Sequence, residues 1–151
     1  MNRRYLLVLL RVATGFLFLY AGASKIMDPE WSAAGYLSAA KTLPSFYSWL
    51  LSPEILPVVN LINEWGLALL GISLVLGLFV RLGSVLGSVL MLLYYIPILD
   101  FPYAGEHSYI VDEHIIYILV LLYFASVNAG RVLGLDGIFT SGFGKLAKLL
   151  G

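Results

Sequence analysis

Long apolar stretches bounded by polar or helix-breaking residues constrain this chain more than any other feature of its sequence. A helix needs roughly 20 apolar residues to cross the hydrocarbon core of a bilayer. Four windows reach about that length, at residues 5–26, 55–80, 82–99 and 110–129. Only 12% of the 151 residues are charged, which is about half the share of a water-soluble domain. The sequence therefore predicts an all-α membrane protein, a bundle of four transmembrane helices in one domain covering residues 1–151.

The distribution of charge predicts how the bundle sits in the membrane. Basic residues gather at the termini and at the turn between the second and third windows, namely Arg3, Arg4, Arg81, Arg131, Lys145 and Lys148. Acidic residues gather at the other end, namely Asp28, Glu30, Glu54, Asp100, Glu106, Asp112 and Glu113. Because basic residues favour the cytoplasmic side, both termini are expected in the cytoplasm.

The connection between the first two windows is too polar to span and too short for a separate folded domain. Asp28-Pro29-Glu30 and Ser52-Pro53-Glu54 each place a capping residue before a proline and an acid, which predicts helices beginning near Pro29 and Pro53. Aromatic and leucine residues recur between them. We expect a short amphipathic cap over about residues 29–52, lying at the extracytoplasmic interface.

Each predicted helix carries one stripe of polar and small residues. At 100° per residue, the stripe of the first window is Arg11, Gly15, Phe18, Gly22 and Lys25, and that of the second is Asn60, Glu64, Ala68 and Gly71. The stripe of the third window is Gly83, Gly87, Leu90 and Tyr94, and that of the fourth is His114, Tyr117, Leu121, Ala125 and Asn128. Ionisable residues within a span are expected to face the bundle interior. With cytoplasmic termini, all of the ionisable members except Arg11 fall in the outer half of the bilayer, which predicts a polar site there.

The residue types suggest roles for the members of that site. Glu64 and His114 are candidates for proton transfer, and Lys25, Tyr94 and Tyr117 are candidates for ligand contact. Arg11 and Arg81 are expected to have structural, ion-pairing roles. Two alternatives stay open: Glu64 pairs with Lys25 or Arg11 to hold the helices in register, and His114 is an interfacial histidine bonded to water and backbone.

Several classes of chemistry are disfavoured. The chain has no cysteine, so no thiol redox site or cysteine-ligated iron–sulfur cluster is expected. Only one of the two histidines lies on a predicted helix, which argues against haem, and the spacing of His and acidic residues fits no metal site. The balanced net charge gives no attraction to nucleic acid.

Three segments resemble the DoxX family: RVATGFLFLYAGASK with Arg11 and Lys25, EWGLALLGISLVLGLFVR with Glu64 and Arg81, and AGRVLGLD at residues 129–136. The segment WSAAGYL is similar to the DoxD branch, the membrane subunit of thiosulfate:quinone oxidoreductase. The resemblance implies a four-helix membrane bundle in a prokaryotic plasma membrane. It also implies an oxidoreductase system with a second subunit and quinone as a bound substrate.

The leading hypothesis is a membrane subunit that handles quinone in the outer half of the bundle. A noncatalytic scaffold or assembly subunit, in which the stripes only lock the helices, is the alternative. A small-solute or proton-coupled transporter is a third reading, although no inverted repeat or mid-membrane helix break supports it. Besides the lipid bilayer, a second copy of the chain is a candidate partner, because Gly83 and Gly87 form a G-x-x-x-G pattern.

Overall fold

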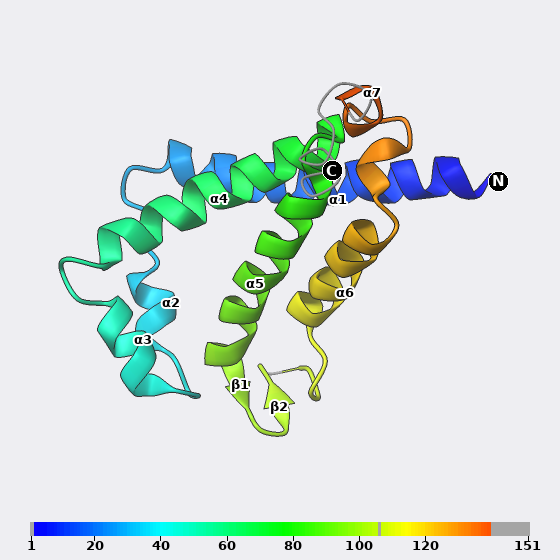
Figure 1. Ribbon diagram of the computed structural model, residues 1–151. Helices are drawn as coiled ribbons and strands as arrows, with labels where there is room; N and C mark the ends of the chain where they lie inside the picture. The colour runs from blue at the N-terminus through cyan, green and yellow to red at the C-terminus, as the bar shows by residue number, and fades with distance from the viewer. Residues whose placement is uncertain (1, 106, 140–151) are drawn as a thin grey trace.

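The structure is a computed structural model that describes residues 2–105 and 107–139 (Figure 1). The elements in chain order are α1 (Arg3–Met27), α2 (Ala34–Ser38), α3 (Pro44–Leu50), α4 (Leu56–Leu76), α5 (Val80–Ile98), β1 (Leu99–Asp100), β2 (Tyr103–Ala104), α6 (Glu113–Ser126), η1 (Ala129–Arg131) and α7 (Asp136–Phe139). Three residues used in the orientation prediction, Glu106, Lys145 and Lys148, lie outside the described residues.

Helices α1, α4 and α5 are long and apolar enough to cross a bilayer, so the chain is a multi-pass membrane protein. Helix α6 is apolar but has only 14 residues, a length of roughly 21 Å at 1.5 Å per residue. The predicted window at residues 110–129 is therefore too long. Asp112 starts the helix by accepting hydrogen bonds from the backbone N–H groups of His114 and Ile115, and Asn128 follows its end with a left-handed φ of 50°.

The two proline signals misplace the helix starts. Asp28 accepts a hydrogen bond from the N–H of Glu30 in a local turn, and α2 begins only at Ala34. Pro53 likewise lies in a turn, and α4 begins at Leu56. A side chain that can cap a helix can also close an isolated turn, as Asp28 does, whereas at Ser52 the backbone carbonyl accepts the hydrogen bonds, from the N–H groups of Ile55 and Leu56. The expected cap between the first two spans contains two short helices, α2 and α3.

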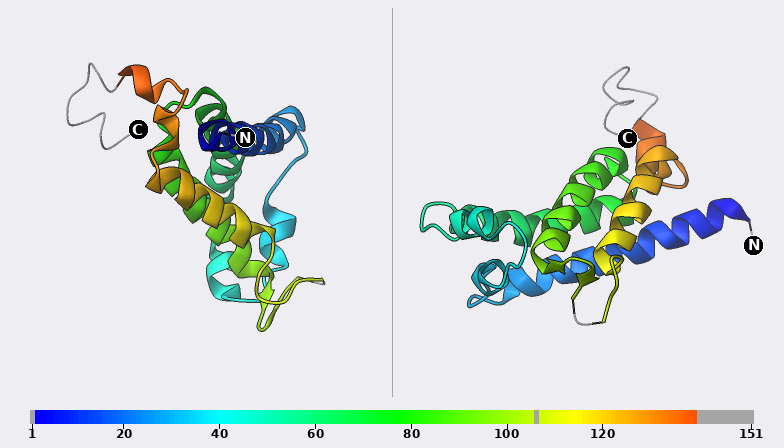
Figure 2. Two further views of the ribbon diagram at one scale, coloured as in Figure 1. Left: turned by 90° about the vertical axis from the view of Figure 1, so that its right-hand side faces the viewer. Right: turned by 90° about the horizontal axis from the view of Figure 1, so that it is seen from below.

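The long helices form two pairs rather than one aligned bundle. Helix α1 packs along α4, and α5 packs along α6. The second pair crosses the first steeply, as the views in Figures 1 and 2 show. The α1–α4 seam is very close: a Cβ on Gly22 would lie 2.3 Å from the backbone N of Ala68, and one on Gly71 would lie 2.3 Å from that of Leu19. Only glycine fits at these two positions.

Four of the five members of the predicted α1 stripe are buried, namely Arg11, Gly15, Phe18 and Gly22, and Lys25 is half-buried. On α4 the buried face differs from the predicted one. It carries Asn63, Leu67, Ala68, Leu70, Gly71 and Leu74. Ala68 and Gly71 contact α1 as the pattern predicts, but the helix turns Asn63 rather than Glu64 inward.

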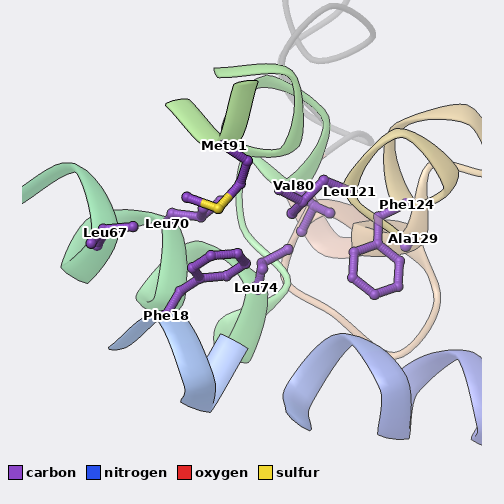
Figure 3. Packing of buried hydrophobic residues seen from close by; sticks show 9 residues of the cluster. All are labelled: Phe18, Leu67, Leu70, Leu74, Val80, Met91, Leu121, Phe124 and Ala129. Carbon is purple, nitrogen blue, oxygen red and sulfur yellow. The ribbon is translucent and has the colours of Figure 1, made fainter. Parts of the chain in front are cut away.

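Two hydrophobic clusters hold the fold together. The main core joins the four longest helices, and in Figure 3 Phe18 of α1 projects between Leu70 and Leu74 of α4, near Met91 of α5. A separate cap cluster of Ala33, Leu37 and Tyr47 lies in the α2–α3 region. The cap is thus a second small packing unit rather than an extension of the main core.

Arg11 ties the first helix to the end of the last one. Its side chain is 1% exposed, and its guanidinium donates hydrogen bonds to the carbonyl oxygens of Ala129 (2.5 Å), Val132 (3.2 Å) and Leu133 (3.3 Å). A helix end leaves carbonyl groups unpaired, and a rigid fork of N–H donors can bind several at once. Gly77, with a φ of 68°, leaves room for it, because a Cβ there would lie 2.8 Å from Arg11 Nη1.

Asp136 completes this junction from the other side. Its carboxylate accepts hydrogen bonds from the N–H groups of Phe79 (2.7 Å) and Val80 (3.1 Å) at the start of α5, and its own N–H donates to the carbonyl of Gly77 (2.8 Å). A carboxylate is favourable at a helix N-terminus. The residue 129–136 segment therefore links α1, the α4–α5 turn and α6; we call these contacts the Arg11 junction.

Replacing Arg11 by methionine should destabilise the protein. The variant removes the guanidinium's hydrogen bonds to three carbonyls, so we expect the free energy of unfolding to fall by about 2 kcal/mol or more. A thermal melt of the detergent-solubilised protein followed by circular dichroism measures the loss. Arg3→Met, at an exposed site in the first turn of α1, is the matched control and should leave the melting temperature nearly unchanged. Equal melting of the two variants would contradict a stabilising role for the junction.

Candidate functional site

A cavity of about 570 Å³ lies between the main core and the cap cluster. Residues from α1, α2, α3, α4, α5 and α6 line it, together with the segment that leads into α2. Its volume falls within the range of small-molecule sites, and its walls are mostly apolar with a few polar groups, the usual composition of such a site. The steep crossing of the two helix pairs, covered by the cap, provides the space.

The structure brings together four of the five residues predicted for the polar site. Lys25, Tyr94, His114 and Tyr117 all line the cavity, from α1, α5 and α6. Glu64 does not line it. It is partly exposed on α4, and within the described part of the chain it forms no ion pair with Lys25 or Arg11.

Asn63 occupies the place on α4 that the sequence assigned to Glu64. It is 5% exposed and accepts a hydrogen bond from the Tyr94 hydroxyl, and its amide donates to the carbonyl of Val59 (2.7 Å). The signal that identifies it is an apolar stripe with one amide, at Asn63, Leu67, Leu70 and Leu74. The ionisable neighbour at position 64 is a more conspicuous residue, but it lies about 100° around the helix.

His114 and Asp112 form a hydrogen-bonded pair at the edge of the cavity. Asp112 Oδ2 lies 2.5 Å from His114 Nδ1, and the side chains of Asp112 and His114 are 7% and 17% exposed, respectively. The same carboxylate caps α6, so it is held from two sides. A partner on one ring nitrogen sets the tautomer and orientation of an imidazole. With Nδ1 engaged, Nε2 is the His114 nitrogen available to a ligand.

Lys25 enters the cavity at the end of α1. Its ammonium lies 5.1 Å from the centroid of the Trp31 ring, a cation–π distance. No carboxylate in the described ranges 2–105 and 107–139 forms a salt bridge with it. The ammonium therefore keeps N–H donors that a ligand oxygen can accept from.

Tyrosines surround the polar end of the cavity. The Tyr94 ring meets those of His114 and Tyr36 edge to face, each with centroids 5.8 Å apart, and the Tyr36 hydroxyl donates to the carbonyl of Tyr94. Burial raises the pKa of Tyr36 and of Tyr47 in the cap above the ordinary value. Both cap phenols therefore stay protonated at neutral pH and act as hydrogen-bond donors.

Pro97 explains how the cap is attached. A proline inside a helix has no N–H for the carbonyl four residues earlier, so the carbonyl of Leu93 lacks its helical partner. The Tyr47 hydroxyl of α3 donates to that carbonyl at 3.0 Å. Nearby, the Lys41 N–H donates to the carbonyl of Pro97 (2.8 Å), and Thr42 donates to that of Leu99. The cap thus binds carbonyls that the end of α5 leaves unpaired.

The two arginines with predicted structural roles lie away from the cavity. Arg11 is on α1 about 14 residues before Lys25, roughly 21 Å along the helix. Its direct partners are backbone carbonyls, while the charge of Asp136 also acts on it. Arg81 is exposed in the first turn of α5. Neither residue lines the cavity.

Comparison with known proteins identifies one relationship. The DoxX family matches residues 6–98, which covers more than half of the chain and reaches from α1 to the end of α5. No curated protein and no solved structure gives a significant match. The 129–136 segment, which resembles the family motif and forms the Arg11 junction, lies beyond the matched range.

The attachment of the cap is testable with a double-mutant cycle. Tyr47→Phe should lower the free energy of unfolding by about 1 kcal/mol, because it removes the hydrogen bond to the Leu93 carbonyl. In a Pro97→Ala background, the restored N–H at position 97 can pair with that carbonyl, so the same change should cost less. Thermal or denaturant unfolding of the four proteins measures the coupling.

The control for the cycle is Tyr103→Phe, an exposed tyrosine in β2. It should have little effect in either background. A cost of Tyr47→Phe that is the same with the proline present and with Pro97→Ala would show that the proline is not the reason for this contact.

Proposed function

This chain belongs to the DoxX family, and from that premise we propose that it is a membrane subunit of an oxidoreductase system that binds a quinone in the cavity. The observation that carries the proposal is the pairing of an apolar, aromatic-walled cavity with two convergent polar groups, Lys25 and His114. A quinone has a flat apolar ring with carbonyl oxygens on opposite sides. Such a ring needs apolar walls and a hydrogen-bond donor for each oxygen.

The residues present fit this ligand. Lys25 donates from its ammonium to one ring oxygen, and His114 Nε2 bonds the other, held in orientation by Asp112. Tyr94 and Tyr117 contact the ring faces or edges. When bound, a quinone accepts two electrons and two protons to become a quinol. In the proposal the electrons come from a partner oxidoreductase subunit, and His114 passes protons to or from the ring.

Glu64 has a narrower place in this proposal than the sequence suggested. Because it lies outside the cavity lining, it does not contact the ring. Its proposed role is to exchange protons between the neighbourhood of the cavity and water, one helical position away from Asn63.

The proposed membrane topology has four crossings with both termini in the cytoplasm. The cap then covers the extracytoplasmic end, where the acidic residues gather. Helix α6 is shorter than a bilayer core, and such a segment is accommodated by local thinning of the bilayer or by its flanking residues. In this arrangement the cavity lies in the outer half of the membrane.

A noncatalytic scaffold is the second candidate, and one observation favours it. Asn63 and Tyr94 hydrogen-bond each other, so part of the polar stripe is satisfied without a ligand. Under this alternative the polar groups hold the helices in place, and the partner subunit carries all of the chemistry. Measuring ligand binding separates the two candidates.

The binding test uses the full chain in lipid nanodiscs and a benzoquinone analogue with a short alkyl chain. Quenching of tryptophan fluorescence reports binding, because Trp31 lines the cavity. Replacing either donor, by His114→Gln or Lys25→Met, should raise Kd by about tenfold, since a hydrogen bond to a charged or polarised group contributes about 1.5–3 kcal/mol.

His107→Gln is the matched control, because His107 is exposed in the loop between β2 and α6 and does not line the cavity. It should keep the Kd of the unaltered protein. If both cavity variants bind the analogue as tightly as this control, the proposed quinone site is wrong and the result supports the scaffold alternative.

A further inference from the structure

The cavity has a polar end and an apolar end. Along α1, its lining runs from Lys25 through Ala21 to Phe18 and Leu17. The eight residue steps between Lys25 and Leu17 correspond to roughly 12 Å along the helix. The lining of α1 therefore changes from a charged group near the cap to purely apolar groups farther into the span.

Helix α5 repeats this gradient, because its lining passes from Tyr94 to Leu90 as the helix is followed away from the cap. On α4 the amide of Asn63 is the polar group, between Ile62 and Leu67 in the lining. On α6, His114 precedes Tyr117, whose ring meets that of Phe18 edge to face with centroids 5.6 Å apart. A ligand that fills the cavity is thus expected to be polar at one end and apolar at the other.

The apolar end opens toward the lipid at Leu17. This residue lines the cavity and is 42% exposed, whereas its neighbour Phe18, which also lines the cavity, is 2% exposed. A residue of a membrane-spanning helix that is exposed on its outer side faces acyl chains. Leu17 therefore contacts both the cavity and the hydrocarbon core, so it marks an opening between them.

We propose that the ligand is a membrane-dissolved amphiphile whose hydrocarbon tail passes Leu17 into the bilayer while its polar ring stays near Lys25 and His114. This inference rests on the proposed function and names the substrate class, a quinone with a long apolar tail rather than a water-soluble quinone. The tail occupies the apolar end and continues into lipid, where its burial costs nothing further. The ring reaches the cavity from the membrane and not from water.

The test compares two quinone analogues that share one ring, a tailless analogue and an analogue with a long isoprenoid tail. Leu17→Trp narrows the opening in the nanodisc-embedded full chain. We expect it to raise Kd for the long-tailed analogue by about tenfold, the loss expected from displacing about two methylene groups from apolar surroundings. The Kd for the tailless analogue should stay within about twofold, because that ligand ends inside the cavity.

Two further variants complete the test, one with a smaller substitution and one as a control. Leu17→Phe, a smaller plug, should act in the same direction with a smaller effect. Leu10→Trp is the matched control, because Leu10 is 39% exposed on the same helix but does not line the cavity. It should alter neither Kd.

The outcomes separate the two levels of the proposal. If the tailless analogue binds but neither Leu17 variant discriminates between the two ligands, the opening at Leu17 is wrong while the quinone site stands. If neither analogue binds the unaltered protein, the proposed function fails, and the tail pathway fails with it.

Discussion

The arrangement of the spans depends on the hydrogen bonds that the buried guanidinium of Arg11 donates. A charge inside a membrane protein is costly unless its donors are paired, and Arg11 pairs with three carbonyls that follow the end of α6. Those carbonyls belong to residues far away in the chain, so the contact holds the first and last parts of the described fold together. Asp136 extends the junction to the start of α5.

The junction and the cavity lie at opposite ends of α1. At the Arg11 end, Gly77 and Gly134 permit close contact, because a Cβ on either would lie 2.8 Å from Arg11 Nη1. Toward the Lys25 end, the crossed helix pairs diverge and the cap covers the space between them. The carbonyl freed by Pro97 gives the cap a specific attachment point through Tyr47. One end of the molecule thus serves stability, and the other provides the candidate site.

Sequence reasoning found much of this because the relevant signals are local. Hydropathy located three spans within a few residues, and the 100° periodicity identified the buried stripe of α1. It failed where two local signals compete, or where the packing partner of a helix determines which face of that helix is buried. Asp112 signals the start of α6, but the apolar residues before it extended the predicted window. The rotation of α4 about its axis depends on how Ala68 and Gly71 meet α1, and that rotation places Asn63 rather than Glu64 in the cavity.

The sequence by itself determined that the chain enters a membrane, which segments form long helices, and which end of each helix carries ionisable groups. These follow from apolar composition and helical rise, which do not depend on distant residues. Only the tertiary structure decided that the helices cross as two pairs, that Tyr47 meets the carbonyl freed by Pro97, and which polar groups share a cavity. Those features depend on close contacts between segments far apart in the chain. The physical reason is that the rotation of a helix and its crossing angle are set by the surface of the helix against which it packs.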